Sequence, residues 1–176
     1  MPDQPYRFLE LDAETRALMT SELDLDITQH GSPYAGSGTL TPKGEADYPD
    51  LLRSAIASGS EVDLVASLRR DGRESPDRVD NALRLGRSEF NRYYIRAICR
   101  RATAHGTTEV VVYRARESES HRSGSDELVG TTQSAPRILA SVRASQGGDA
   151  ATGIGRVNSG ITVRCGCVAC LAVGEP

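Results

Sequence analysis

Residues 88–104 carry the pattern that most constrains how this chain folds. Ser88 is a suitable N-cap and Gly106 suits the position just beyond a helix end, so a helix is bounded on both sides. Apolar side chains recur at helical spacing between these bounds, at Phe90, Tyr94, Ala97 and Ile98. Arginines recur every four residues on another face, at Arg92, Arg96 and Arg100, joined by Arg101. We therefore predict a helix that packs one side inward and presents guanidinium groups on the other.

The remaining segments predict a mixture of helices and strands. The β-branched run 107–114 follows the central helix and is typical of a strand, and 161–164 alternates as a second one. A short strand is expected at 128–130. Further helices are expected at 12–27, 47–58, 61–70 and 135–145. The mixture predicts an α+β fold that is helix-rich in its N-terminal two thirds, with a small sheet, long Gly/Ser-rich loops and extended termini.

The chain divides into three regions by composition. Residues 1–46 form an acidic region, with the first helix followed by an extended connector over 28–46. Residues 47–145 form a central α+β domain, and residues 146–176 combine a Gly-rich loop, a strand and a cysteine-rich C-terminal arm. The total of 176 residues suits one domain of ordinary size with extensions.

The net charge of −3 conceals a strong asymmetry along the chain. Residues 1–50 contain ten acidic and three basic residues, whereas residues 84–116 contain eight arginines and two glutamates. Either the basic segment contacts nucleic acid through its phosphates, or the acidic segment lies on the basic one, within the chain or on a neighbouring subunit. A nucleic-acid-binding domain is usually basic overall and this chain is not, so we favour pairing between protein segments.

The arginine row is the first candidate interaction site. It could bind a phosphate backbone, pair with carboxylates or be a solvated face. Guanidinium groups suit bidentate pairing with carboxylates at interfaces, and the required acids are abundant in residues 1–50. We therefore expect contacts within a homo-oligomer or with a partner protein, made by Arg92, Arg96, Arg100 and Arg101.

The four cysteines are the second candidate site. Three of them lie within six residues, at Cys165, Cys167 and Cys170, and Cys99 lies in the central helix. They could be thiols, disulfides within the C-terminal segment or between subunits, or zinc ligands. Because C-x-C-x-x-C lacks the usual second C-x-x-C, a zinc ion there would need a further ligand from Cys99, His105, His30 or His121.

Signals for enzymatic chemistry are weak. Lys43 is the only lysine and has no G-x-x-x-x-G-K-[ST] around it, which excludes a P-loop. The glycines of 153–160 precede a strand rather than a helix, the reverse of the dinucleotide fingerprint. Asp24 and Asp26 are paired acids, but their acidic surroundings favour a solvated surface. We therefore expect no enzymatic activity.

The sequence also lacks the usual membrane and export signals. No run approaches the ~20 apolar residues that a membrane span requires. The first ten residues show no basic region followed by an apolar one, so no secretory signal is expected. We expect a protein that is made in the cytoplasm and does not contact a membrane.

Several segments resemble a group of small structural proteins encoded beside virion genes of tailed bacteriophages. The likeness is carried by EFNRYYIRAICRRA at 89–102, VYRA at 112–115 and NSG at 158–160 with the strand after it, and more loosely by 40–57. The segment 165–170 is an addition to the pattern. The resemblance implies a non-enzymatic virion component near the capsid or neck, made in the host cytoplasm, with other virion proteins as partners. The alternative is a nucleic-acid-binding accessory protein that uses the arginine-rich helix.

Overall fold

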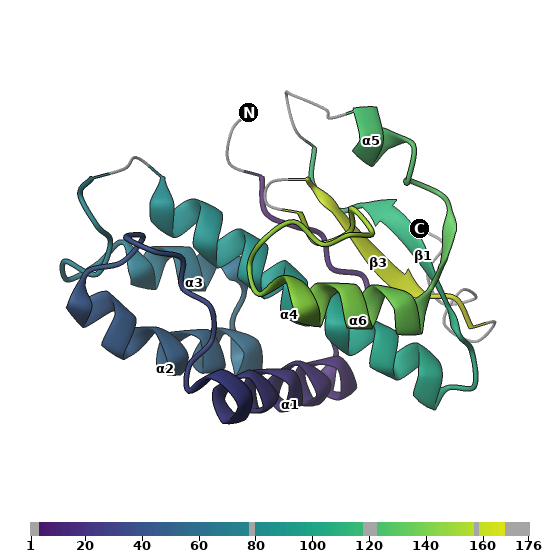
Figure 1. The fold of residues 1–176 in the computed structure, drawn as a ribbon, viewed down its shortest axis with the longest axis horizontal. Coiled ribbons are helices and arrows are strands. Elements are labelled where there is room, and N and C mark those ends of the chain that lie inside the picture. Colours follow the sequence, from purple (N-terminus) through teal and green to yellow (C-terminus); the bar gives the residue numbers. More distant parts are fainter. Residues whose placement is uncertain (1–3, 78–79, 118–122, 157–158, 168–176) are drawn as a thin grey trace.

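A computed structural model describes residues 4–77, 80–117, 123–156 and 159–167 (Figure 1). These residues form six helices and a three-stranded antiparallel sheet, so the fold class is α+β. In chain order the elements are α1 (Ala13–His30), α2 (Pro42–Ser58), α3 (Glu61–Leu68), α4 (Asn81–Ala104), β1 (Glu109–Arg114), α5 (Ser123–Asp126), β2 (Thr132–Ser134), α6 (Ala135–Ser145) and β3 (Ile161–Cys165). None of the described helices is long and apolar enough to cross a membrane.

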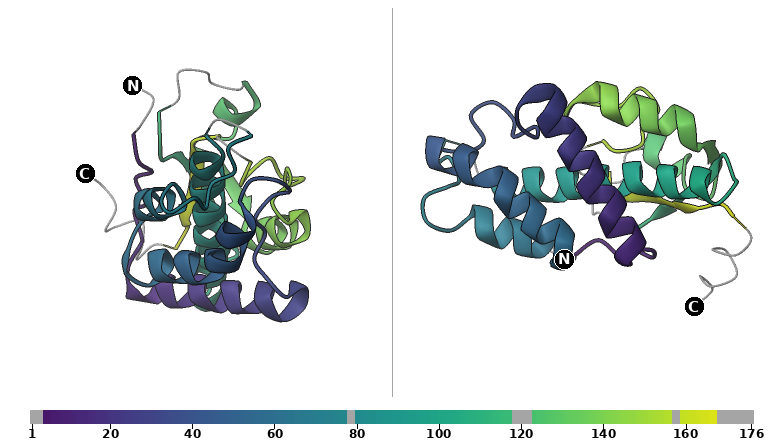
Figure 2. Two further views of the ribbon diagram at one scale, coloured as in Figure 1. Left: turned by 90° about the vertical axis from the view of Figure 1, so that its left-hand side faces the viewer. Right: turned by 90° about the horizontal axis from the view of Figure 1, so that it is seen from below.

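The helix α4 runs through the middle of the molecule, with α2 and α3 beside its N-terminal half and α6 and the sheet beside its C-terminal half (Figure 1). Seen from below, α1 crosses α4 steeply (Figure 2). The largest buried side chains of α4 join those of the other elements in one core, including Phe90, Tyr93, Tyr94, Ile95 and Ile98. Elements from all three regions expected from the sequence therefore share this core.

The sheet has the order β2-β1-β3, with β1 antiparallel to both neighbours. In the registers, Val110 lies opposite Gln133 of β2, and Val112 lies opposite Val163 of β3. The side chain of Asn91 donates to the backbone oxygen of Ile161 over 3.0 Å and so joins α4 to the sheet. The strand expected at 128–130 is wrong: these residues form a turn, and the third strand is β2.

Two helices begin earlier than the sequence predicts. Thr41 caps α2 by accepting from the backbone of Gly44, and Pro42 occupies the first turn, where its missing N–H costs nothing. The connector predicted for 28–46 is therefore shorter, and α2 crosses the expected region boundary at 46. Likewise α4 begins at Asn81, and the hydroxyl of Ser88 donates to the backbone oxygen of Arg84 inside the helix instead of capping it.

The early start of α4 depends on its packing against α3. A Cβ at Gly86 would lie 2.7 Å from a methyl group of Val65, so only glycine allows the two helices to approach this closely. Ala82 and Leu85 are buried in the same stretch. The first two turns of α4 are thus held by tertiary contacts rather than by a local cap signal.

The N-terminal segment before α1 lies against the sheet. Arg7 donates its backbone N–H to Ala115 over 2.8 Å, just beyond the end of β1. The carboxylate of Glu10 accepts from the backbone N–H of Cys165 over 2.7 Å, at the end of β3. Residues from near both ends of the chain therefore meet at the sheet.

Candidate functional site

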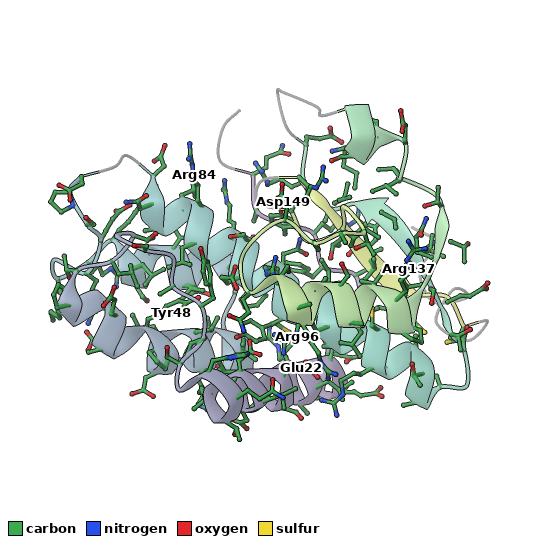
Figure 3. All side chains as sticks on the ribbon, in the orientation of Figure 1. Glu22, Tyr48, Arg84, Arg96, Arg137 and Asp149 are labelled. Carbon is green, nitrogen blue, oxygen red and sulfur yellow. The ribbon has the colours of Figure 1, made fainter. Side chains whose placement is uncertain are left out.

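Arg96 lies inside the molecule between α4 and α1. Its Nε donates to Glu22 over 2.7 Å, and its two terminal nitrogens donate to the carboxylate of Asp26 over 2.7 and 2.8 Å. Arg96 is 5% exposed, and Glu22 is completely buried (Figure 3 labels both). Asp26, expected from the sequence to be solvated, has a side chain only 17% exposed. This is a buried ion-pair network within one chain.

Glu22 also accepts hydrogen bonds from two further arginines. Arg100 donates to its Oε1 over 3.1 Å from α4, and Arg143 donates over 2.5 and 3.0 Å from α6. Burial raises the pKa of Glu22, but hydrogen bonds from Arg143 and the charge of Arg96 outweigh it, so the pKa lies below its ordinary value. One carboxylate therefore holds α1, α4 and α6 together.

Arg92 makes a different set of contacts. Its terminal nitrogens donate to the backbone oxygens of Gly148, Gly155 and Val142 over 2.9, 3.2 and 3.0 Å, and also to the hydroxyl of Ser145. The side chain is 3% exposed. Arg92 thus anchors the end of α6 and the Gly-rich loop to α4.

Arg101 completes the row at the α1 end. It donates to Asp12 over 2.7 Å and lies 3.4 Å from Glu14, both at the beginning of α1. Charge pairing between the acidic and basic segments therefore takes place within the chain. The expectation that the row faces outward is wrong for Arg92 and Arg96, which are both buried. Arg92 donates to backbone oxygens, and Arg96 donates to carboxylates that are distant in sequence.

The structure brings His105, Cys165 and Cys167 together at the C-terminal end of α4. One ligand atom from each lies within 4.8 Å of the others, which makes a candidate metal-binding group. Glu14 contacts Nε2 of His105 over 3.0 Å. The pKa of His105 is raised, first by a hydrogen bond with Cys167. Of the histidines considered as the additional ligand, His105 is the one that the described structure places in this group.

Of the other predicted ligands, Cys99 and His30 lie away from this group. Cys99 is buried in the core, where burial raises its thiol pKa to about 12, and it is not part of the described metal-binding group. His30 contacts Gln146 over 2.8 Å at the far end of α1. Cys170 and His121 lie outside the described residues. Among the described residues, Cys99, Cys165 and Cys167 form no disulfide.

A polar cavity of about 440 Å³ lies where the end of α1, the connector 31–41, α2, α4 and α6 meet. Buried Arg92, Arg96 and Glu89 line it together with Asp26 and Arg143. Exposed residues of the connector also line it, so it opens to solvent there. Tyr34 of the connector packs onto Gly147, where a Cβ would lie 2.0 Å from the ring.

Two buried groups in this cavity were not predicted from the sequence as site residues. Glu89 is 4% exposed, and burial raises its pKa to about 7, because the opposing effect of Arg92 is smaller. Tyr48 is 1% exposed, and its hydroxyl has no hydrogen-bond partner among the described residues. Burial and the charge of Glu89 raise the pKa of Tyr48 well above its ordinary value. A carboxyl group that titrates near neutrality inside a cavity marks a candidate binding site.

Comparison with models of protein families, with curated proteins and with solved structures finds no match to this chain.

Proposed function

We propose that the chain is a non-enzymatic structural or assembly protein of a tailed phage particle, as a capsid decoration, minor capsid or head–neck component. It acts through contacts between subunits and with other virion proteins. The observation that carries the proposal is the resemblance over 89–102, over 112–115, and over 158–160 with the strand β3 that follows. The strand β3 is distant in sequence from the first two segments yet lies beside them, because α4 packs on both β1 and β3 and the two strands pair.

The rival function, nucleic-acid binding through the arginine row, is disfavoured by the geometry. Arg92 and Arg96 are 3% and 5% exposed and already donate to groups of the protein. Phosphate contacts need guanidinium groups that reach the surface. Of the row, Arg100 is the most accessible, with a side chain 33% exposed.

The assembly role predicts that the protein copurifies with phage particles. We expect mass spectrometry of gradient-purified virions to detect the chain at a fixed ratio to the major capsid protein, with a non-virion enzyme of the same phage as the negative control. Retention of the protein in the soluble fraction as a monomer, with none in particles, would refute this function. DNA binding lost in Arg100→Glu would favour the rival.

A second proposed function is the binding of zinc at the C-terminal end of the described chain. Tetrahedral zinc takes thiolate and imidazole ligands, whose donor atoms then lie roughly 3.5–3.8 Å apart. The candidate ligand atoms of His105, Cys165 and Cys167 lie within 4.8 Å of one another, so they would need to move only slightly closer together to bind zinc. Glu14 would orient the imidazole from its other side, as carboxylates do behind metal-bound histidines. We propose Cys170 as the fourth ligand, from its C-x-x-C spacing to Cys167.

Zinc binding predicts one equivalent of metal for each chain purified under reducing conditions, measured by mass spectrometry of the metal content. Replacement with cobalt should give thiolate-to-metal charge-transfer bands. We expect Cys167→Ser to lose both signals and Cys99→Ala, in the core, to keep them. Absence of zinc from the reduced wild type, or its retention by Cys167→Ser, would exclude this site. A non-reducing gel and thiol titration identify disulfides instead.

A further inference from the structure

The polar cavity contains acceptor groups that the protein leaves unused. The nearest ionic partner of Glu89 is Arg92, whose Nε lies 3.6 Å from the carboxylate, beyond hydrogen-bond distance. Within the described ranges no side chain or backbone group donates a hydrogen bond to Glu89. The hydroxyl of Tyr48 also lacks a partner there. Both residues line the cavity.

The arginines of the cavity, in contrast, already use most of their donors. Arg92 donates to three backbone oxygens and a hydroxyl, as described above. Arg96 donates to Glu22 and Asp26, and Arg143 donates to Glu22 through two nitrogens. The cavity therefore retains two acceptors, the carboxylate of Glu89 and the hydroxyl of Tyr48, to which none of its arginines donates a hydrogen bond. A ligand that complements it supplies N–H groups and a positive charge.

We propose that this cavity binds a ligand through a primary ammonium group, which donates to the carboxylate of Glu89 and to the hydroxyl of Tyr48. An ammonium has three donors and no acceptor, so one ammonium can donate to two acceptor groups that line the same cavity. The aliphatic part of the ligand would lie along the apolar lining, at Pro49, Val142 and Tyr34. The cavity volume of about 440 Å³ is within the usual range for small-molecule sites.

The energetic argument supports a cation over an anion. A buried carboxylate without hydrogen bonds is costly, and a paired and hydrogen-bonded one is much less so. Burial raises the pKa of Glu89, and the charges of Arg92 and Arg96 offset this only in part. Two sources could supply the ammonium: a free small amine or a lysine side chain of a partner protein. The only lysine of this chain, Lys43, donates instead to Asp71. The site is proposed independently of particle assembly.

Titrations followed by ¹H–¹⁵N NMR of the whole chain test the proposal with probes of matched size. We expect butylammonium to shift resonances of the cavity, including the side-chain Nε–H of Arg92, with a dissociation constant of about 1 mM. Neutral 1-butanol and anionic butyrate should bind at least about tenfold more weakly. Tighter binding of Nα-acetyl-lysine amide than of butylammonium would assign the site to a lysine side chain; equal or weaker binding would assign it to a free amine.

Variants separate this binding role from a structural one. Glu89→Gln keeps the shape of the site, and we expect it to weaken butylammonium binding at least about tenfold while the chain stays folded. Tyr48→Phe should weaken it about threefold to tenfold. Asp50→Asn, an exposed change on α2 outside the cavity, removes the same unit of charge and should leave binding intact. Binding by folded Glu89→Gln with unchanged affinity, or stronger binding of butyrate, overturns the proposal.

Discussion

Replacement of Glu22 with glutamine is expected to destabilise the folded chain by about 3–5 kcal/mol, the usual loss when one partner of a buried ion pair is removed. Glu22 is completely buried and accepts from Arg96, Arg100 and Arg143. Glutamine retains the shape but presents an NH₂ group to these donors. Arg96 would keep its bonds to Asp26, whereas Arg100 and Arg143 would lose the carboxylate to which they donate.

Urea unfolding followed by circular dichroism measures this loss as a shift of the midpoint. The matched control is Asp24→Asn on the same helix, whose exposed pair with Arg53 is expected to contribute less than about 1 kcal/mol. Equal stabilities of the two variants would show that the buried network contributes little to the fold.

The same network predicts sensitivity to acid. Because the pKa of Glu22 is lowered in the folded state, its contribution is present above its ordinary value of 4.5 and is lost as the pH falls through the folded-state pKa. The stability of the wild type should therefore decline more steeply with acidification than that of Glu22→Gln. Asp26 and Asp12, whose pKa values are also lowered, contribute to the decline in both proteins.

Glu89→Gln is expected to act in the opposite direction and to stabilise the ligand-free protein above neutral pH. The pKa of Glu89 rises from 4.5 to about 7 on folding, and each unit corresponds to about 1.4 kcal/mol. A raised pKa stabilises the folded state below pH 4.5, and this contribution is lost as the pH rises through 7. At pH 9 glutamine should therefore gain about 3 kcal/mol over the wild type, and at pH 5 less than about 1 kcal/mol.

Melting curves of the two proteins at pH 5 and pH 9 test this prediction. Asp50→Asn, an exposed change outside the cavity, should show no such pH-dependent gain. A variant that is less stable than the wild type at pH 9 would indicate that ionised Glu89 stabilises the fold through Arg92. A gain would mean that the wild type retains a destabilising group at its cavity, as binding sites commonly do.

Segments with strong local signals could be predicted well from the sequence. The helix expected at 135–145 coincides with α6, where Ser134 caps the first turn and Pro136 lies near its start. The strand expected at 161–164 differs from β3 by one residue. Apolar spacing, caps and β-branched runs are local properties, so the α+β class could be predicted from them.

The environment of the arginine row could not be predicted in the same way. The partners of Arg96 are 70 and 74 residues away in sequence, and no local pattern specifies that α1 crosses α4 at that turn. A row of arginines at helical spacing predicts an exposed face of the helix, unless it is known that acidic residues of another helix pack against it. Glu89 directly follows Ser88, the predicted N-cap of this helix, but α4 begins at Asn81, so Glu89 lies well inside the helix.

The metal-binding group could be predicted in part from the sequence. The thiol spacing identified Cys165 and Cys167, and His105 was one of the residues considered for the missing ligand. Cys99 was an equally reasonable choice until the fold placed it in the core. The selection depends on β3 pairing antiparallel with β1, which brings Cys165 next to the end of α4.

The contact between the segment before α1 and the end of β3 has a consequence for biosynthesis. During translation, α1 leaves the ribosome long before α4 and α6, so Glu22 and Asp26 stay hydrated until their arginines have been made. The bond between Glu10 and Cys165 spans 155 residues and can form only after Cys165 has been synthesised. This contact therefore forms late in folding, at a rate limited by closing a long loop rather than by forming helices.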